Sequence, residues 1–318
     1  MLLALREVAG IRCAYFGSIM DIRFGVAPIA WTNSDLPQLG GETTLETCLT
    51  ESKRAGFSGT ETGVKFPMDA AQLGPVLQRH GLKLVSGWFS GELLDGSVEA
   101  ERARIESQLA TFKALNAPML VYAETTGSVQ SKIDVPVSRR PRIPDERFRN
   151  YGRKLTALAE HLADRGVALT YHHHMGTIVE SQREIDLLMA HTGPAVGLLI
   201  DTGHLTYAGA DIATVTRRHA RRVNHVHCKD VRFDVLKKVR QTDASFLSAV
   251  LEGVYTVPGD GFVDYYAFAR LLADIGYEGW AVVEAEQDPV KAPPYEYSRM
   301  GRNHLAAAFA AAGYDIVD

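Results

Sequence analysis

The chain has 318 residues, 46% of them hydrophobic, and a formal net charge of −4 from 34 Lys and Arg against 38 Asp and Glu. This charge excludes a strongly basic nucleic-acid-binding surface and gives no attraction to an anionic membrane. No apolar run approaches the ~20 residues of a membrane-spanning helix, and the length suits a single α/β barrel. We therefore expect neither nucleic acid nor membrane as a partner.

The N-terminus lacks the ordered regions of a secretory signal, and Met20 stands just before the first predicted strand. We interpret residues 1–19 as an N-terminal extension and residues 20–318 as one domain. An odd number of widely spaced cysteines does not indicate a disulfide framework, and free thiols are typical of a reducing cytoplasm. We therefore expect a cytoplasmic protein with three free thiols, which are Cys13, Cys48 and Cys228.

The first half of this domain alternates between strand and helix patterns. The predicted strands are residues 22–27, 56–61, 82–87 and 118–122. The predicted helices between them are residues 45–55, which follow a capping-box pattern, residues 69–80, which end at Gly81, and residues 98–115. Residues 123–144 are irregular and contain the basic cluster Arg139, Arg140 and Arg142. This loop is either a solvated face or a lid or subunit contact.

The second half continues the alternation. Its predicted strands are residues 167–171, 196–200, 223–227 and 279–284. Its predicted helices are residues 145–165, 181–191, 211–219, 265–275 and 296–312, and residues 229–263 form a second long connection. Eight strands with about as many helices predict a parallel sheet that closes into a single (β/α)8 barrel. The alternative is an open doubly wound sheet, but no G-x-G-x-x-G pattern follows the first strand.

Acidic and imidazole side chains stand at the ends of the last four predicted strands, where the active sites of such barrels lie. A mixed set of imidazoles and carboxylates suits a divalent transition metal, so we predict a metal site here. Asp201 ends an apolar strand, where a carboxylate is costly unless it is paired or metal-bound. It could instead cap a following helix, but His204 three residues later favours a metal role. The candidate ligands at these strand ends are Asp201, His172, the pair His225 and His227, and the pair Glu284 and Glu286.

Alternation along the strands predicts which side chains face the same way. His225 and His227 share one face, as do Glu284 and Glu286. His172 and His174 also share a face, whereas His173 points away from it. His174 is a candidate for orienting substrate, and His225 is a candidate for contacting it. Lys229 is a candidate acid or base, or else it forms a salt bridge with Asp230. Further candidates for substrate contact at the other strand ends, some of which could equally be core residues, are Trp31, Asn33, Glu61, Lys65 and Trp88. Glu61 could instead hold a metal ligand in place.

Seven short motifs, in order along residues 22–310, resemble the xylose-isomerase-like barrel superfamily and, within it, the inosose dehydratase family. They are GVAPIAWTN at 25–33, LGGE at 39–42, YHHHMGT at 171–177, DTGHL at 201–205, HVHCKD at 225–230, TVPGDG at 256–261 and VEAEQDP at 283–289. Each motif is weak alone, but the ordered set is specific.

The resemblance implies a lyase that holds Mn²⁺ or Co²⁺ and dehydrates 2-keto-myo-inositol, a small cyclic polyol ketone, to a trihydroxycyclohexane-dione. It also implies pairing of subunits into dimers or tetramers. The superfamily takes Glu, Asp, His and Glu ligands from strands five to eight. These positions correspond to His172, Asp201, His227 and Glu284, so a histidine stands here where a glutamate is usual.

The expected mechanism is a metal-stabilised enediolate, in which a base removes the proton next to the ketone and an acid protonates the departing hydroxyl. The base candidates are Glu284 and Glu286, and the acid candidates are His204, His172 and Lys229. Three other functions remain open. A ketose isomerase or epimerase shares the enediolate, a repair nuclease would need a basic groove that this net charge does not favour, and a sugar-binding barrel would not turn over substrate.

Overall fold

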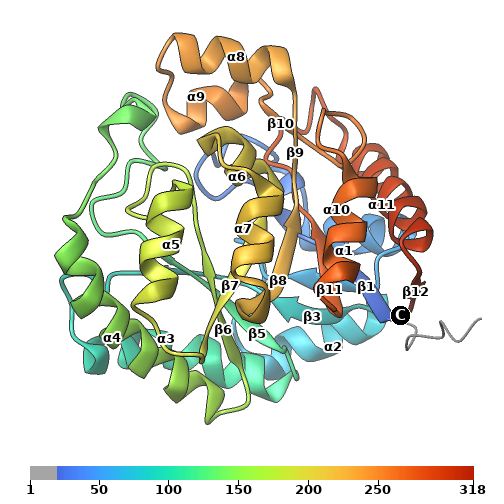
Figure 1. Ribbon diagram of the computed structural model, residues 1–318. Helices are drawn as coiled ribbons and strands as arrows, with labels where there is room; N and C mark the ends of the chain where they lie inside the picture. Colours follow the sequence, from blue (N-terminus) through green and yellow to red (C-terminus); the bar gives the residue numbers. More distant parts are fainter. Residues whose placement is uncertain (1–19) are drawn as a thin grey trace, which may run out of the picture.

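A computed structural model describes residues 20–318, and the proposed N-terminal extension, including Cys13, lies outside the described residues. The predicted barrel is confirmed, because a parallel sheet is surrounded by helices (Figure 1). Neighbouring strands follow the order β3 (Lys83–Ser86), β2 (Gly59–Glu61), β1 (Met20–Val26), β11 (Gly279–Val283), β8 (Val223–Cys228), β7 (Val196–Asp201), β6 (Ala168–His172), β5 (Met119–Glu124) and β4 (Trp88–Gly91).

The barrel closes at a single glycine. β3 pairs with β2 while β4 pairs with β5, and only Gly87 separates β3 from β4. The Thr62 N–H donates to the Ser86 carbonyl on one side at 2.9 Å, and the Val121 N–H donates to the Gly87 carbonyl on the other at 3.0 Å. We predicted that this strand ends at residue 87. It continues instead to Gly91, because residues 88–91 pair with β5 although their sequence shows no clear strand pattern.

Helices cover the outside of the sheet, and the apolar faces that the periodicity predicts are buried against it. They are α1 (Leu45–Arg54), α2 (Ala70–His80), α3 (Val98–Ala114), α4 (Asp145–Ala163), α5 (Gln182–Ala190), α6 (Thr202–Ala208), α7 (Ile212–Arg218), α10 (Tyr265–Asp274) and α11 (Pro294–Ala311). The capping box predicted at residues 43–46 does not form, because α1 is capped one residue later by Thr44, whose hydroxyl accepts from the Thr47 N–H. A last short strand, β12 (Tyr314–Ile316), pairs with β1.

The long connection after β8 is folded. β9 (Asp230–Val231) and β10 (Tyr255–Thr256) form an antiparallel pair, and α8 (Phe233–Gln241) and α9 (Phe246–Leu251) lie between them in the chain. In Figure 1 these two helices stand apart from the ring, beyond the strand ends. Their apolar side chains form a second core with loop residues that include Leu36, Leu39 and Met175. The connection therefore builds a small cap beside the predicted active-site face.

The loop after β5 contains the short helix η2 (Val137–Arg139), and two further short helices, η1 (Pro28–Ala30) and η3 (Ala220–Arg222), lie before α1 and β8. Arg139 and Arg142 are exposed, as the solvated interpretation requires. Arg140 contradicts that interpretation, because it is buried and pairs with Glu180 at 3.1 Å and Glu184 at 2.7 Å. None of the helices in residues 20–318 is long and apolar enough to cross a membrane.

Candidate active site

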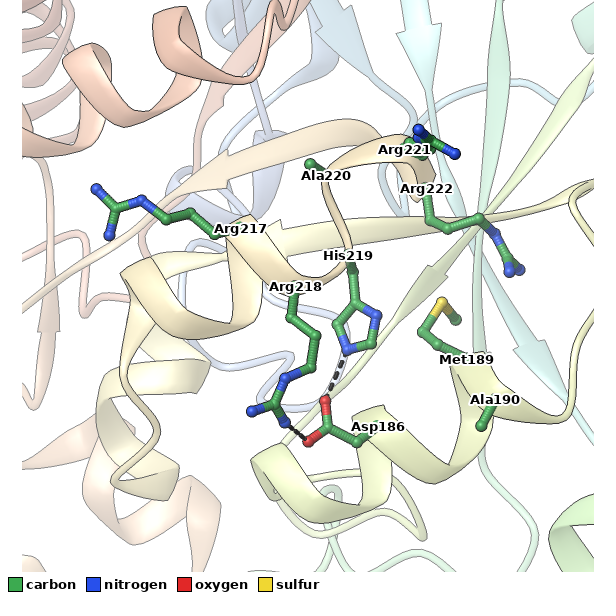
Figure 2. A pocket seen from close by; sticks show the side chains of 9 residues that line it. All are labelled: Asp186, Met189, Ala190, Arg217, Arg218, His219, Ala220, Arg221 and Arg222. Atoms are coloured by element: carbon green, nitrogen blue, oxygen red, sulfur yellow. Dashed lines mark hydrogen bonds and ion pairs between the residues drawn. The ribbon is translucent and has the colours of Figure 1, made fainter.

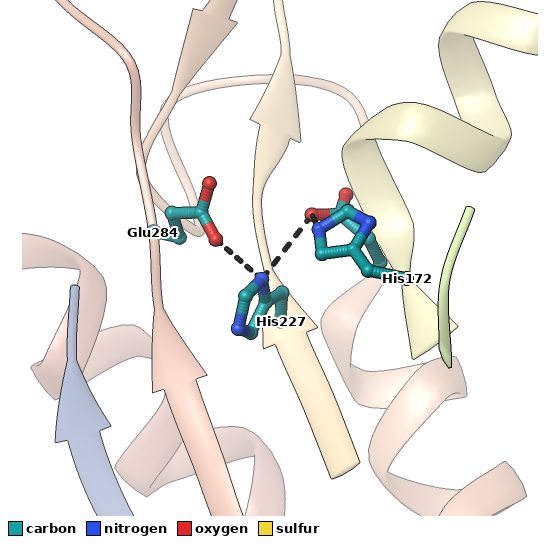
Figure 3. A group of neighbouring side chains, drawn as sticks. His172, His227 and Glu284 are labelled. Atoms are coloured by element: carbon teal, nitrogen blue, oxygen red, sulfur yellow. Dashed lines mark ion pairs between the residues drawn. The ribbon is translucent and has the colours of Figure 1, made fainter. Parts of the chain in front are cut away.

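Four buried side chains converge at the C-terminal ends of the strands. His172 ends β6, Asp201 ends β7, His227 lies on β8, and Glu284 follows β11 directly. One potential ligand atom of each lies within 4.8 Å of the corresponding atoms of the others. Figure 3 shows His227 between Glu284 and His172. The structure therefore brings together the four residues that the resemblance implies as ligands.

Hydrogen bonds at the far side of each ring direct the histidine lone pairs into this cluster. His172 Nδ1 donates to the His173 carbonyl at 2.7 Å, which leaves Nε2 facing Asp201 Oδ2 at 3.6 Å. His227 Nε2 donates to Glu61 Oε1 at 3.0 Å, which leaves Nδ1 in contact with Glu284 Oε2. A histidine held in this way by a carboxylate or carbonyl presents the tautomer that binds a metal ion.

Asp201 divides its two oxygens between two tasks. Oδ1 accepts from the His204 N–H at 2.8 Å and so caps α6. Oδ2 is fully buried and accepts no hydrogen bond from residues 20–318, and the Lys229 ammonium lies 3.7 Å from it. A buried carboxylate oxygen without a donor is costly unless a cation neutralises it. Together with His227 Nδ1, which faces both Asp201 and Glu284, this oxygen shows that the four residues fit a divalent ion.

Glu61 supports the cluster by accepting hydrogen bonds from the two histidines on β8. Its Oε1 accepts from Ser86 Oγ and from both His225 Nε2, at 3.1 Å, and His227 Nε2. Burial alone would raise the pKa of Glu61, but the two imidazoles and their hydrogen bonds hold that pKa well below its usual value. The shared face that alternation predicts for His225 and His227 is confirmed, and both rings rest on one carboxylate.

Lys229 forms a second polar centre beside the first. Its fully buried Nζ lies 2.7 Å from Glu284 Oε1, 2.9 Å from Glu286 Oε2 and 3.0 Å from His204 Nε2. Burial alone would lower the pKa of Lys229, but the surrounding carboxylates raise it above its ordinary value, so the amine is a cation. The suggested salt bridge to Asp230 is absent from the described structure, because Asp230 accepts four backbone N–H groups instead.

Two further shifts follow from burial in this region. Burial raises the pKa of Glu286 to about 7, although Lys229 opposes the change. Burial also lowers the pKa of His174 to about 4, so that imidazole is neutral near pH 7. The rings of His174 and His204 pack at a tilt of 45° with centroids 3.9 Å apart, and with Glu286 they form another group of close potential ligands. His173 stays outside both groups and accepts from the Asp201 N–H.

A pocket of about 560 Å³ opens onto these groups. Its lining includes Glu61, Trp88, His174, His227, Glu284 and Glu286. A volume of this size suits a small cyclic ligand. Trp88 forms one wall and packs edge-on against both His172 and His174, with centroids 5.5 and 5.4 Å apart. His204, Lys229 and His225 lie behind the lining residues.

Besides His225, three residues that the sequence indicated as substrate contacts do not line this pocket. Trp31 is buried in the main core, and its indole N–H donates to Glu51 Oε2 at 2.6 Å. Asn33 is turned into its own loop, where Oδ1 accepts from the N–H groups of Asp35 and Leu36. Lys65 is exposed and donates to the carbonyls of residues 41 and 43. Each has a structural role that its position at a strand end could not reveal.

The sequence did not indicate three other residues in or behind the pocket wall. Asp35 and Gln130 come from loops, and neither side chain receives or donates a hydrogen bond within residues 20–318. Tyr255 lies behind the pocket, where its ring packs 4.8 Å from Lys229 Nζ and its hydroxyl bonds to His204 Nδ1 at 3.2 Å. The irregular loop after the fourth predicted strand was a signal for Gln130. No pattern indicated Asp35 or Tyr255.

A second pocket of about 540 Å³ lies at the opposite ends of the strands, between α5, α7 and η3. Figure 2 shows that its arginine side chains point in different directions. Arg218 and His219 pair with Asp186, while Arg222 donates to the carbonyls of residues 192, 193 and 196. These basic groups hold the segment before β8 in place and do not converge on a common point.

Comparisons with known proteins agree with this geometry. A family model described as a xylose isomerase-like TIM barrel matches residues 49–308. The chain is 51% identical over 297 residues to the rhizopine catabolism protein MocC of Rhizobium meliloti, covering 93% of this chain and 91% of that protein. It is 42% identical over 286 residues to the inosose dehydratase of Geobacillus thermodenitrificans, covering 89% and 96%.

Solved structures share the barrel at low sequence identity. The probable 3-DHS dehydratase AsbF of Bacillus anthracis has a TM-score of 0.66 and 13% identity, covering 89% of this chain and 98% of that one. The IOLI protein with a binding zinc atom has a TM-score of 0.64 and 17% identity, covering 91% and 98%. The fold and the strand-end site thus define a TIM-barrel enzyme. The chain belongs to the xylose isomerase-like TIM-barrel family and, within it, to the inosose dehydratase family.

Proposed function

We propose that the protein is a metal-dependent hydro-lyase that converts 2-keto-myo-inositol (scyllo-inosose) to a trihydroxycyclohexane-1,2-dione and water. The observation that carries this proposal is the buried four-donor cluster at the pocket, in a chain 42% identical to an inosose dehydratase over most of its length. His227 and Glu284 belong to both the cluster and the pocket lining. An ion in the cluster and a substrate in the pocket would therefore meet.

The candidate cofactor is Mn²⁺ or Co²⁺, held by His172, Asp201, His227 and Glu284. Two imidazoles and two carboxylates suit either ion. When bound, the ion supplies Lewis-acid polarisation of the substrate ketone, which acidifies the neighbouring C–H bond. Glu61 keeps His227 in the ligating tautomer through the Nε2 hydrogen bond. Trp88 supplies an apolar wall for the carbon face of the ring.

Glu286 is the residue best placed to move the proton. It lines the pocket, whereas the acid candidates His204 and Lys229 lie behind the lining. Lys229 holds one oxygen of Glu286 at 2.9 Å and so fixes the direction of the carboxylate. Glu286 removes the proton from the carbon beside the ketone and then delivers it to the β-hydroxyl, which departs as water. This assignment needs no proton from outside the site.

The test is an assay of the purified protein with scyllo-inosose, following the absorbance of the conjugated dione. We expect dione formation that stops on treatment with a chelator and returns with Mn²⁺ or Co²⁺. Asp201→Ala and His227→Ala are expected to lose both the metal and the activity. Activity that survives complete chelation would contradict the metal. Isomerisation of ketoses without dione formation would instead identify the protein as a sugar isomerase or epimerase.

A further inference from the structure

Gln130 lies in the pocket wall with its side-chain amide unused. The residue belongs to the loop between β5 and α4 and is only 7% exposed. Its Oε1 is buried and has no hydrogen-bond partner among residues 20–318. Buried amide groups are nearly always hydrogen-bonded, because leaving one unpaired costs free energy. An unpaired amide that borders a pocket therefore points to a partner that enters the pocket.

Gln108 provides an internal comparison. It lines the same pocket, but its Nε2 donates to the Trp88 carbonyl at 3.1 Å. Its amide is therefore committed to the protein and helps to hold the aromatic wall. Of the two glutamines in the lining, Gln130 is the one whose side-chain amide makes no hydrogen bond within residues 20–318 and whose Oε1 is buried.

The backbone around Gln130 is held firmly against the segment that carries His174. The Val129 N–H donates to the Gly176 carbonyl at 2.9 Å. Gly176 adopts a φ of 81°, and a Cβ there would lie 2.9 Å from the Gln130 backbone nitrogen. Only glycine permits this approach. Further along the loop, Arg140 donates to the Thr177 carbonyl at 3.1 Å. Hydrogen bonds at Val129 and at Arg140 therefore hold the loop against the YHHHMGT segment at two points.

We propose that Gln130 is a specificity-determining residue whose amide hydrogen-bonds a ring hydroxyl of the cyclic polyol substrate. This inference deepens the proposed function and rests on it for the substrate class. An amide offers both a donor and an acceptor, and so does a hydroxyl, so the two groups match in either orientation. A site that pairs with a hydroxyl discriminates against an analogue without it, because its own polar group is then left buried and unpaired.

The experiment compares binding of scyllo-inosose and of deoxy analogues that each lack one ring hydroxyl. Dissociation constants are measured by calorimetry on the full chain for the wild type and Gln130→Leu. We expect the wild type to bind one analogue about ten-fold more weakly than the parent, the size of a neutral hydrogen bond. For Gln130→Leu we expect that ratio to fall to about one, while the other ratios are unchanged.

Gln130→Leu removes no hydrogen bond within the protein, so we expect it to fold, and Gln130→Met serves as a second variant of similar length. Gln108→Leu is the matched control, and it should change affinity for the parent and that analogue by the same factor. Identical analogue profiles in the wild type and both Gln130 variants would overturn the inference. Loss of the same ratio in Gln108→Leu would overturn it too.

Dehydration is measured separately, through the dione absorbance of the wild type. Binding that discriminates through Gln130 without any dione would overturn the proposed function and leave this inference standing. Dione formation, with analogue profiles that the Gln130 variants leave unchanged, would support the proposed function and overturn this inference. A wild type that does not bind scyllo-inosose would overturn both.

Discussion

At the scale of single residues, the site uses carboxylates that each serve two neighbours. Asp201 caps α6 with Oδ1 and leaves Oδ2 in the ligand cluster. Glu284 contacts His227 and Lys229 with different oxygens, and Glu61 supports two imidazoles with one. Buried charges are tolerated only when they are paired in this way. Substitutions that remove one task and keep the other can therefore separate folding from metal binding.

Asp201→Asn and Asp201→Ala are expected to differ in stability but not in metal binding. Asparagine keeps an oxygen that accepts from the His204 N–H, whereas alanine loses the cap of α6. We expect the alanine variant to be less stable than the asparagine variant by about 1 kcal/mol. Both should lose the metal, because both remove the anionic Oδ2. Urea unfolding of the metal-free proteins and metal analysis give the two readouts, and equal stability of the two variants would contradict the capping role.

Glu61→Gln is expected to weaken metal binding although Glu61 is not in the four-residue ligand cluster. The amide cannot hold two imidazole N–H donors on one anionic oxygen, so the tautomer of His227 is no longer enforced. Loss of such a supporting carboxylate typically lowers metal affinity about 10–100-fold. Competition with a chromophoric chelator measures the affinity. Glu46→Gln on the exposed surface of α1 is the control and should bind metal as the wild type does.

The strand-end pattern indicated the region of the four candidate ligands, the family resemblance selected them from their neighbours, and alternation correctly paired His225 with His227. The sequence allowed Glu61 to support a metal ligand but could not predict that the supported residues are these two histidines, since β2 and β8 are not neighbouring strands and more than 160 residues of chain separate Glu61 from them. It also could not distinguish Trp88 in the pocket from Trp31 in the core. Both depend on barrel geometry, which a local pattern does not contain.

At the scale of elements, the regular strands and helices were predictable and the long connections were not. Strong apolar periodicity marks the barrel units, and the structure confirms eight of them. α8 and α9 were missed because their apolar residues pack on loops such as residues 36–39, not on the sheet. The loop at residues 123–144 is likewise ordered by distant partners, through Arg140 and through the bridge between Pro136 and Ser245.

Arg140→Ala is expected to destabilise the protein and to loosen this loop. The substitution leaves Glu180 and Glu184 mostly buried without their cation, and breaking a buried ion pair from one side costs about 3 kcal/mol. Urea unfolding measures the loss, and limited proteolysis detects cleavage within residues 125–144. Arg139→Ala is the control, because this neighbour is exposed and forms no ion pair within residues 20–318. Equal stability of the two variants would contradict the anchoring role of Arg140.

At the scale of the whole molecule, the site exists because the sheet closes. Glu61 is the last residue of β2 and Trp88 is the first residue of β4. These two strands come together only through the β3–β4 segment. A Cβ at Gly87 would lie 1.9 Å from Thr62 Oγ1 and 2.9 Å from the Phe112 ring, so only glycine fits at this junction. Closure of the barrel therefore requires a residue without a side chain at position 87. Nothing in the local sequence pattern marks Gly87 as the closing residue.

Gly87→Ala is the substitution that tests this closure. Because overpacking of a tight interior typically costs about 1–3 kcal/mol and this contact is closer than atoms allow, we expect a loss at the upper end of that range. The displacement should also disturb Ser86, which donates to Glu61, so metal affinity should fall with stability. Gly74→Ala, within α2, is the matched control, since a Cβ there meets only the flexible end of the Leu115 side chain. In a helix, alanine is more favourable than glycine by about 1 kcal/mol. Calorimetric melting and metal titration of both variants decide the matter: a Gly87 variant as stable as the Gly74 variant would show that the sheet closes without this glycine.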